Sequence, residues 1–568
     1  MASFRSIARP LAAGLASLTV AAALSLTALP AVQAAPAPAT APATAPGFIE
    51  TGVSDPVSAA PEVTRPGTQS CTATLAQDFP SNATNGSPQN FSGTLAPPAA
   101  CPGPWSKVVL DYTSKVSGRQ FDRSGTLQIG GVNVWFGTTQ EPSGPQTTTF
   151  HFSKDITDFA SLLTTPQPFS GGIGNYTSDV YTGVYSQTVT VTYYRTGKGF
   201  PAARTPDKVV AVPVSDLNPG SPSATATLTG LPRNITQAEL QVTLKGNGCD
   251  EQWFTTVPDA VAANFPGAGL CGHGSFREAL VSVDGTRAGA VGTYPHVYSG
   301  GIVPTLWRPV LAIDTLSLRP ENLDLTPFAG RLVDGGTHQF TVSMNPIGDN
   351  WNVMANLFLY TDHGQARTTG ALVSSDVAAA ATAFTTVNPP KNGAVKYTQD
   401  ATRHDSTTGY INTSAGKVFT TVASNRVWRN AGTASDNGLI QSISQSDRMT
   451  SNSTSKVGNR TIRSNSLQES YPITVDASSA NYTNDQNFSL TATVHMGQQV
   501  DSVMKEGSAR TARNWNWTLD SYGILGRSAG VTSESDGHST SAYKGTDDNG
   551  RPYRHFIVTE HGKVLINK

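Results

Sequence analysis

The sequence predicts an all-β protein, and three observations lead to that fold class. Charged side chains make up only 14% of the 568 residues, whereas the chain holds 53 glycines and 37 prolines. Many short runs alternate apolar and polar residues, as half-buried antiparallel strands do. Helical periodicity is nearly absent, apart from one or two turns expected between 373 and 386. Together these features favour short strands joined by many turns.

The N-terminal residues predict export. Arg5 and Arg9 precede an apolar run and a small-residue cleavage site ending at Ala34, which is typical of a signal peptide over 1–34. A retained membrane anchor is the alternative, but no stop-transfer charges follow the run. Residues 35–68 are rich in Ala, Pro and Thr, so we expect an extended linker there and folded structure from about Cys71. The protein is therefore expected outside the cell.

The remainder is too long for one hydrophobic core, and we expect three β-rich regions. Glycines and prolines at 196–206 and a shift to Ser, Thr and Asn beyond 364 give the limits 69–200, 206–364 and 365–568. The glycine pair inside 126–136 is interpreted as a bulge. The strands expected from alternation are 105–112, 126–136, 184–194, 238–244, 279–283, 338–344, 352–360, 471–475, 490–495 and 556–558.

The charge balance argues against some binding partners, and the four cysteines predict disulfide bonds. A net charge of -1, from 39 basic and 40 acidic side chains, gives no electrostatic footprint for nucleic acid or anionic lipid. The cysteines allow three pairings. We expect the sequence-local ones, Cys71 with Cys101 and Cys249 with Cys271, each adding about 3 kcal/mol in an oxidising compartment.

A metal site is the alternative for the second cysteine pair. Cys249, Asp250, Cys271 and His273 are all metal-ligating types, but no CxxC or HExxH spacing accompanies them. We therefore expect no metal, no cofactor and no stable membrane insertion.

The stretch from Gly246 to Phe254 is the densest in chemistry. Asp250 and Glu251 stand between Cys249 and Trp253, as in a site that grips a polar ring and moves a proton. A disulfide-pinned surface loop is the equal alternative. No GxSxG elbow and no phosphate loop occurs, and the GxGxxG match at 267–272 does not follow a buried strand.

Carboxylates in glycine- and aromatic-rich turns remain as the candidates for chemistry. Asp122 beside Arg123 forms either a structural ion pair or a base and a cation presented together ahead of a strand. The other members of this set are Glu141, Asp250, Glu251, Glu278 and Asp334.

Eight sequence blocks in order carry a resemblance to a known family. They are Leu110-Asp111-Tyr112, Gly118-Arg119-Gln120-Phe121-Asp122-Arg123, Thr139-Gln140-Glu141-Pro142, Gly248-Cys249-Asp250-Glu251, Phe276-Arg277-Glu278, Tyr298-Ser299-Gly300-Gly301, Leu306-Trp307-Arg308-Pro309 and Leu325-Thr326-Pro327-Phe328. Over about 105–364 the chain resembles the peptide-N4-(N-acetyl-β-glucosaminyl)asparagine amidase A family, secreted enzymes known as peptide:N-glycosidases. No block that we can match lies beyond about Arg367.

The resemblance implies hydrolysis of the bond between the innermost N-acetylglucosamine and asparagine of a glycopeptide or glycoprotein, without a metal. It also implies two adjacent antiparallel jelly-roll β-sandwich domains, as in a related bacterial peptide:N-glycosidase, ahead of the further β-rich region. That enzyme carries its essential aspartate in an aromatic-Asp-Arg motif, which Phe121-Asp122-Arg123 matches with Phe in place of Trp. Asp122 is thereby the first catalytic candidate.

An amide is a poor electrophile, so its hydrolysis needs an activated water, a stabilised oxyanion and a proton for the departing nitrogen. We expect Asp122 to activate the water or to polarise the amide. We expect Glu251 to position the sugar or to handle the proton of the leaving group. Glu278 is the alternative second carboxylate, although Arg277 or Arg308 would pair with it. The expected substrate-binding residues are Arg123, Asp250, Trp253, His273, Arg277, Trp307 and Arg308.

Two other functions stay open at this point. The same carboxylates suit a glycoside hydrolase that cleaves a sugar-sugar bond. The Ser/Thr/Asn-rich C-terminal region suits a non-catalytic carbohydrate-binding protein. In each case the expected partner is a glycan on a peptide or protein, and the expected state is a monomer.

Overall fold

The computed structural model describes residues 48–568, apart from 52, 85, 86, 143, 145, 480–482 and 485. Four four-stranded sheets and one twelve-stranded sheet dominate the described chain, and every ladder between named strands is antiparallel. The all-β prediction is confirmed. The expected signal peptide over 1–34 lies outside the described residues.

The first pair of sheets forms a sandwich whose inner side chains make one hydrophobic core. Its first sheet has the order β1 (Ser70–Ser81), β10 (Val184–Arg195), β5 (Trp105–Ser117) and β8 (Thr148–Asp155). The second has the order β4 (Phe91–Leu95), β9 (Gln167–Ile173), β6 (Ser124–Ile129) and β7 (Val132–Thr138). Short elements complete it: β2 (Ala83–Thr84), β3 (Ser87–Pro88), η1 (Thr157–Phe159) and η2 (Leu162–Thr164).

The second pair of sheets forms another sandwich. Its first sheet has the order β11 (Lys208–Val212), β18 (Trp351–Thr361), β13 (Ile235–Gly246) and β16 (Glu321–Asp324). The second has the order β12 (Ser223–Leu228), β17 (His338–Met344), β14 (Glu278–Val283) and β15 (Thr286–Gly292). The loops carry η3 (Gly248–Asp250), η4 (Trp253–Thr255), α2 (Asp259–Ala262), η5 (Pro304–Trp307), η6 (Thr326–Phe328) and α3 (Ala329–Leu332).

Both sandwiches repeat one strand order. Numbered within each sandwich, leaving out the short β2–β3 ladder, the sheets contain strands 1-8-3-6 and 2-7-4-5. This shared order supports the jelly-roll assignment, which stays a prediction, as do the limits of the three regions. The repetition means that equivalent loops of the two sandwiches are available to build one site.

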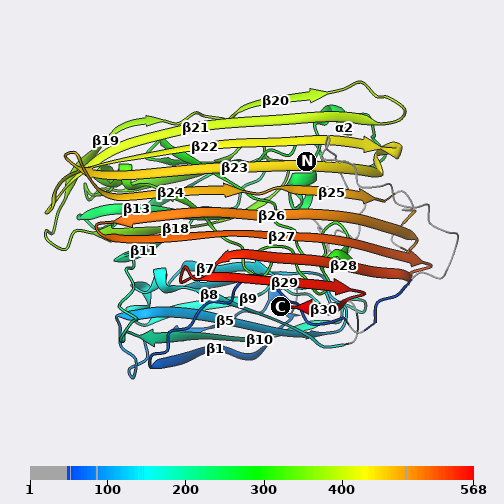
Figure 1. Ribbon diagram of the computed structural model, residues 1–568, viewed down its shortest axis with the longest axis horizontal. Coiled ribbons are helices and arrows are strands. Elements are labelled where there is room, and N and C mark those ends of the chain that lie inside the picture. The colour runs from blue at the N-terminus through cyan, green and yellow to red at the C-terminus, as the bar shows by residue number, and fades with distance from the viewer. Residues whose placement is uncertain are drawn as a thin grey trace, which may run out of the picture.

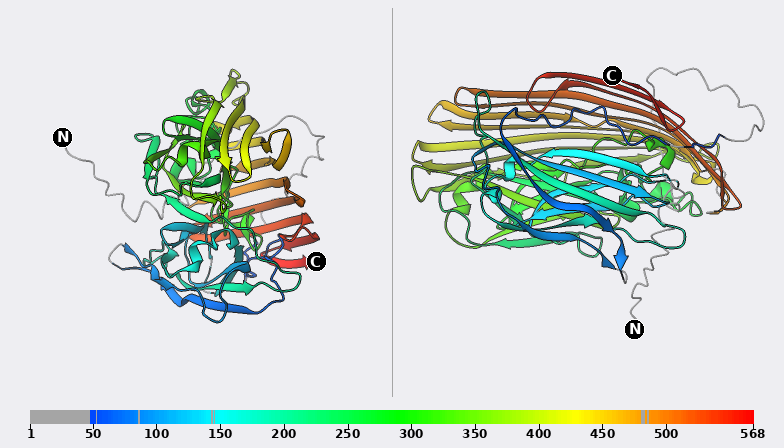
Figure 2. Two further views of the ribbon diagram at one scale, coloured as in Figure 1. Left: turned by 90° about the vertical axis from the view of Figure 1, so that its left-hand side faces the viewer. Right: turned by 90° about the horizontal axis from the view of Figure 1, so that it is seen from below.

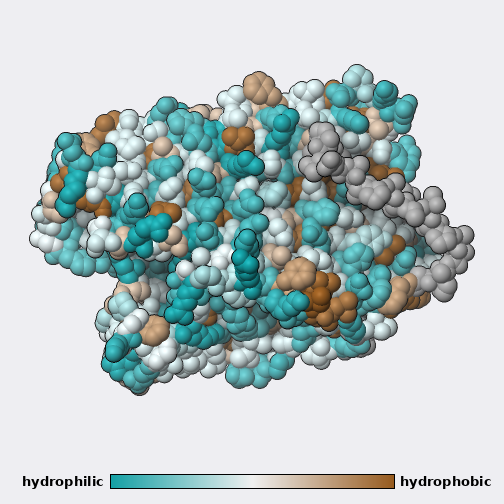
Figure 3. Space-filling model, viewed as in Figure 1, coloured by the Kyte–Doolittle hydropathy of each residue, from teal (hydrophilic) through white to brown (hydrophobic). Residues whose placement is uncertain are grey.

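A single twelve-stranded sheet follows and lies along one side of both sandwiches (Figures 1 and 2). Its strands are β19 (Thr369–Asp376), β20 (Thr382–Val387), β21 (Val395–Thr413), β22 (Gly416–Ser435), β23 (Ile440–Val457), β24 (Arg460–Ser470), β25 (Ile473–Ser478), β26 (Phe488–Glu506), β27 (Ala509–Ser528), β28 (Val531–Thr546), β29 (Pro552–Glu560) and β30 (Lys563–Asn567), with η7 (Asp436–Gly438) between β22 and β23. Hydrophilic residues predominate on its outer face (Figure 3).

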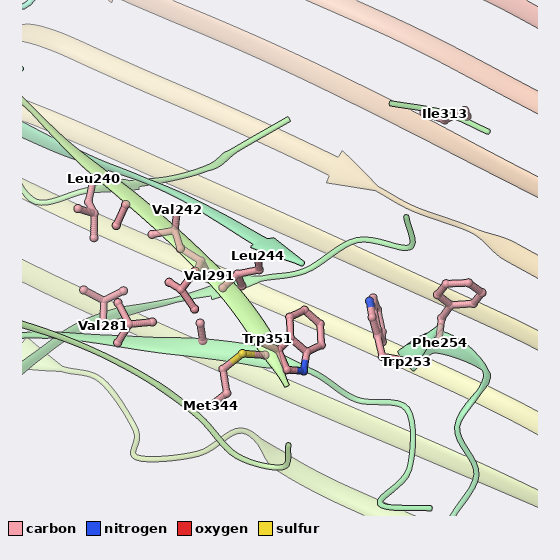
Figure 4. Packing of buried hydrophobic residues seen from close by; sticks show 14 of the residues in the cluster. Leu240, Val242, Leu244, Trp253, Phe254, Val281, Val291, Ile313, Met344 and Trp351 are labelled. Atoms are coloured by element: carbon pink, nitrogen blue, oxygen red, sulfur yellow. The ribbon is translucent and has the colours of Figure 1, made fainter. Parts of the chain in front are cut away.

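The hydrophobic core of the second sandwich continues into this sheet. Leu240, Val242 and Trp351 belong to the same buried cluster as Leu490 and Trp517 of the long strands, and Figure 4 shows the sandwich side of that packing. The C-terminal sheet is therefore attached by core packing, because breaking this contact would expose a shared apolar surface.

Two local predictions are wrong. The expected strand over 126–136 is a hairpin, because Gly130 and Gly131 take φ values of 59° and 79° and form the turn between β6 and β7. The helical turns expected between 373 and 386 are strands β19 and β20, which pair with β21. Tertiary pairing decides the conformation where local preference is weak.

Residues 53–66 form an extended strap that touches all three regions. Ser54 N donates to Gly562 O at 2.9 Å, and Val57 forms a parallel bridge with Val310. Arg65 binds Asp111 of β5 through two hydrogen bonds. Folded structure thus begins before Cys71, contrary to our expectation, because partners distant in sequence bind these residues.

The two expected disulfides, Cys71–Cys101 and Cys249–Cys271, are confirmed. Within the described residues, no helix is long and apolar enough to cross a membrane.

Candidate active site

The loop between β5 and β6 carries Asp122 to the junction of the two sandwiches. Tyr185 holds this loop from inside the first sandwich, where its buried hydroxyl donates to the carbonyls of Phe121 and Gln140 at 2.8 and 2.9 Å. The loop is also tied to the end of β7, because Thr139 N donates to Arg123 O at 2.9 Å. Asp122 is half-buried on a backbone that is fixed on both sides.

Glu141 lies beside Asp122, and Gly300 of the second sandwich contacts both. The Gly300 amide donates to Asp122 Oδ2 at 3.1 Å. A Cβ added at Gly300 would come within 2.3 Å of Glu141 Oε2 and 3.0 Å of Asp122 Oδ1. A larger residue at position 300 would push these carboxyl groups aside, so glycine lets the backbone of one sandwich reach the carboxylates of the other.

Glu251 reaches the same junction on the loop that follows β13. Asp250, the residue before it, anchors that loop by accepting hydrogen bonds from Gly348 N at 2.8 Å and Trp351 Nε1 at 2.7 Å. The Cys249–Cys271 disulfide closes the loop from outside. Glu251 is left half-buried, and no hydrogen bond to its side chain is found among the described residues.

The pKa of each of these three carboxyl groups is raised. Burial and the charge of Asp122 raise the pKa of Glu141 to about 8. Burial and Asp122 likewise raise the pKa of Glu251 to about 7, although Lys245 opposes the shift. Burial also raises the pKa of Asp122, against the Gly300 amide, Lys245 and Arg123. The charge of Asp122 raises the pKa of both glutamates, so both lie near Asp122.

Two cationic side chains border the cluster without pairing with it. Arg123 Nη2 donates to Gln120 Oε1 at 2.7 Å and to Tyr176 O at 3.3 Å, both uncharged acceptors. Lys245 Nζ lies 5.2 Å from the centre of the Tyr298 ring. Neither forms a salt bridge within the part of the chain that the structure describes, so their charge acts on the site through space.

Asp250 and Arg277 form a different arrangement. Both side chains are fully buried, and Arg277 Nη2 lies 2.6 Å from Asp250 Oδ1. Burial raises the pKa of Asp250, but Arg277, Trp351 and Gly348 outweigh it and the pKa is lowered. Neither side chain is exposed to a substrate, in contrast to the binding role that we expected for them.

Glu278 is also held in an ion pair, away from Asp122. Arg403 of β21 donates to both of its oxygens, at 2.7 and 3.0 Å, and Arg403 Nη1 donates to Asp405. The partner is neither Arg277 nor Arg308, which we expected. The structure thus groups Glu251, and not Glu278, with Asp122.

Of the remaining expected binding residues, Trp307 and Arg308 line a pocket with Glu141, and Arg308 opposes the rise in the pKa of Glu141. Trp253 and Trp307 are 2% and 1% exposed, and both belong to the shared core. Arg308 Nη1 lies 3.7 Å from Oε2 of Glu50, in the N-terminal segment. His273 is exposed beside Asp259. The tryptophans therefore present no open face to a sugar ring.

Sequence reasoning assigned no specific role to three residues of the cluster. Glu141 was named only as one of the candidate carboxylates, and Tyr298 and Gly300 only as parts of blocks that carry the resemblance. Their position in the blocks Thr-Gln-Glu-Pro and Tyr-Ser-Gly-Gly was the available signal. Lys245, at the end of a regular strand, offered no signal of this kind.

No group of three or more His, Cys, Asp and Glu side chains among the described residues is arranged to hold a metal ion. The fold and the site together define a class: a β-sandwich protein with unpaired, proton-holding carboxyl groups where two sandwiches meet. The chain belongs to the family described as Peptide N-acetyl-beta-D-glucosaminyl asparaginase amidase A, whose model matches residues 56–378.

A relative is the Peptide-N4-(N-acetyl-beta-glucosaminyl)asparagine amidase A of Prunus dulcis, which is 29% identical over 370 residues. The match covers 61% of this chain and 64% of the relative, so this chain spans less than two thirds of the relative's length.

Two solved structures also match. PNGase F, a glycosylasparaginase from Flavobacterium meningosepticum, is 14% identical with a TM-score of 0.33, over 52% of this chain and 96% of that one. PNGF-II is 14% identical with a TM-score of 0.36, over 51% of this chain and 66% of that one.

Proposed function

We propose that the protein is a peptide:N-glycosidase, which hydrolyses the amide bond between the innermost N-acetylglucosamine and asparagine of N-glycosylated peptides or proteins. One observation carries the proposal beyond family membership. Asp122 and Glu141 of the first sandwich meet Glu251 and Gly300 of the second, and no arginine or lysine neutralises the three carboxyl groups by direct pairing within the described residues. Buried acids without such partners are suited to proton transfer.

Asp122 is the base in this scheme. It accepts a proton from the attacking water, whose oxygen adds to the side-chain carbonyl carbon of the substrate asparagine. The Gly300 amide, 3.1 Å from Oδ2, holds the carboxylate in place and favours its charged form. This contact suits Asp122 to act as the base.

Glu251 supplies the proton that the departing nitrogen needs. Its pKa of about 7 keeps it largely protonated in mildly acidic solution. The carbon–nitrogen bond then breaks, and the products are an aspartate side chain and a glycosylamine. Glu141, with a pKa of about 8, stays protonated, and its Oε2 has no hydrogen-bond partner within the described residues.

Arg123 stabilises the negative charge that develops on the carbonyl oxygen. Its guanidinium is half-buried, and its hydrogen bonds go to neutral oxygens, so its charge is not consumed by a carboxylate partner. A preorganised cation of this kind is most effective where little water screens it. Export by the N-terminal signal and action outside the cell complete the proposal.

Product analysis tests it. A glycopeptide is incubated with the protein in heavy-oxygen water, and the released peptide is examined by mass spectrometry. We expect aspartate with one heavy oxygen in place of the glycan-bearing asparagine. Asparagine that keeps one N-acetylglucosamine would instead indicate cleavage of a sugar-sugar bond. Binding without turnover would indicate a carbohydrate-binding protein, and either result would contradict the proposal.

A further inference from the structure

The turn η5 lies against the inner face of the C-terminal sheet at two facing glycines. Gly523 of β27 and Gly537 of β28 are cross-strand partners. A Cβ added at Gly523 would come within 2.7 Å of Leu306 N, and one at Gly537 within 2.1 Å of Thr305 O. We call this pair the glycine notch. Any larger side chain there would displace the turn.

Two hydrogen bonds fasten the turn in the notch. Thr305 Oγ1 donates to the Ile524 carbonyl at 3.1 Å. Ser539 Oγ donates to the Leu306 carbonyl at 3.3 Å. Thr305 is fully buried and Ser539 is 2% exposed, so water does not compete for these bonds.

The turn is connected to Asp122 by a short chain of contacts. Trp307, which ends η5, donates from Nε1 to the Gly301 carbonyl at 2.8 Å. Gly300, the residue before Gly301, donates from its backbone amide to Asp122 Oδ2 at 3.1 Å. Ser299 Oγ fixes the same segment to the first sandwich by donating to Thr139 O at 2.9 Å. Movement of the turn therefore moves the Gly300 amide, which donates a hydrogen bond to Asp122.

The sheet also contributes charge near the site. Arg527 of β27 lies near enough to Glu141 to oppose the rise in its pKa, together with Arg308 and Arg119. The glycine notch and Arg527 both lie beyond residue 378, where the family match ends. The sheet is thus joined to the site by geometry and by charge.

We propose that the C-terminal sheet is a positioning element of the Asp122 site, in which the glycine notch, Thr305 and Ser539 set the place of the Gly300 amide. The inference rests on the proposed function for its kinetic part only. Gly523, Gly537, Thr305 and Ser539 are positioning residues, because none of them contacts the three carboxyl groups in the described structure.

Thr305→Val and Thr305→Ser are the sharpest variants. Valine keeps the shape of threonine and removes the donor, whereas serine retains it. We expect Thr305→Val to lower kcat by about tenfold with KM changed by less than about twofold, and Thr305→Ser to restore most of kcat. Loss of a merely structural bond would lower the melting temperature without this split.

Gly537→Ala is the stronger variant, and Gly526→Ala on β27 is its matched control. The nearest atom to a Cβ at Gly526 is the rotatable Ser533 hydroxyl, at 3.0 Å. We expect Gly537→Ala to lower kcat by more than about tenfold and Gly526→Ala to leave it unchanged. Ser539→Ala provides a milder test if Gly537→Ala does not fold.

Hydrogen exchange measured by mass spectrometry separates this inference from the proposed function. We expect the peptide spanning 298–303 to exchange faster in Thr305→Val and Gly537→Ala, and at the wild-type rate in Thr305→Ser and Gly526→Ala. Unchanged exchange in folded Thr305→Val would overturn the inference, and so would faster exchange with unchanged kcat. A wild-type protein without activity overturns the proposed function, while the exchange measurement still decides the link.

Discussion

Two clusters of carboxyl groups lie in this molecule, a buried one around Glu278 and a half-buried one around Asp122, and they differ in what surrounds them. In the Glu278 cluster, Arg403 binds Glu278 through two hydrogen bonds and Arg426 binds Asp447 in the same way. In the Asp122 cluster, no carboxylate receives a direct ion pair within the described residues. Paired buried carboxylates join layers of structure, whereas unpaired ones keep protons that are available for chemistry.

The largest effect expected from this comparison is on activity. Asp122→Asn should lower kcat by about a thousandfold, because asparagine accepts no proton from water, while the melting temperature stays near that of the wild type. Asp78→Asn, at an exposed position on β1, is the matched control and should leave kcat unchanged. Full deglycosylation by Asp122→Asn would place the chemistry elsewhere.

The reverse behaviour is expected of Glu278→Gln. Breaking a buried pair with Arg403 should lower the free energy of unfolding by about 3 kcal/mol, because the guanidinium loses one of its two charged partners. The kcat of the folded protein should change by less than about twofold. Denaturant unfolding and steady-state kinetics on one preparation measure both quantities. A large loss of kcat without loss of stability would reverse the roles that we give to the two clusters.

The dependence of activity on pH sharpens the assignment of protons. Glu251 has a pKa of about 7 and must hold its proton to act as an acid, so kcat should fall by about tenfold per pH unit above that value. Glu251→Gln should lower the plateau and remove this fall. A rate that rises with pH above 7 would show that ionised Glu251 is the active form.

The smallest effect concerns the contribution to stability of Glu321, a buried carboxyl group near Glu469 and Asp447 that forms no salt bridge within the described residues. Burial and the charge of Glu469 raise the pKa of Glu321 to about 8 from 4.5. The folded state therefore holds a proton that the unfolded state has released, and the unfolding free energy should fall between about pH 5 and 8, by at most 1.4 kcal/mol per unit for this group. Glu321→Gln should remove this part of the slope, as measured by denaturant titration at several pH values. An unchanged slope would contradict the shift.

The sequence predicted the fold class and part of the site for identifiable reasons. Strands such as 184–194 and 338–344 bury one face in a sandwich, so their alternation is visible in the residue types. Asp122 and Glu251 stand in short motifs. The sequence favoured Glu251 over Glu278 only narrowly and assigned Glu278 the wrong partner, because the arginine that binds Glu278 lies 125 residues away.

The long strands of the C-terminal sheet were hidden for another reason. The inward positions of β21 include Gln399, Arg403 and Asp405 among apolar residues, so the alternation that marks a buried face is broken. Gln399 and Arg403 bind residues of the second sandwich, and Arg403 in turn binds Asp405, contacts that single-sequence patterns do not represent. Glu141 was named as a candidate but given no role, because Gly300, which contacts it, is supplied by the other sandwich.

The strap has a consequence for how the chain assembles. Ile49 forms a bridge with Ser535, and Ser54 binds Gly562, so some of the first described residues to leave the ribosome have partners among the last. Closing so long a loop costs only slightly more entropy than closing a short one, but it must await synthesis of β28 and β29. Deleting the final strands should therefore release the beginning of the chain, and protease cleavage near residue 55 would report that release.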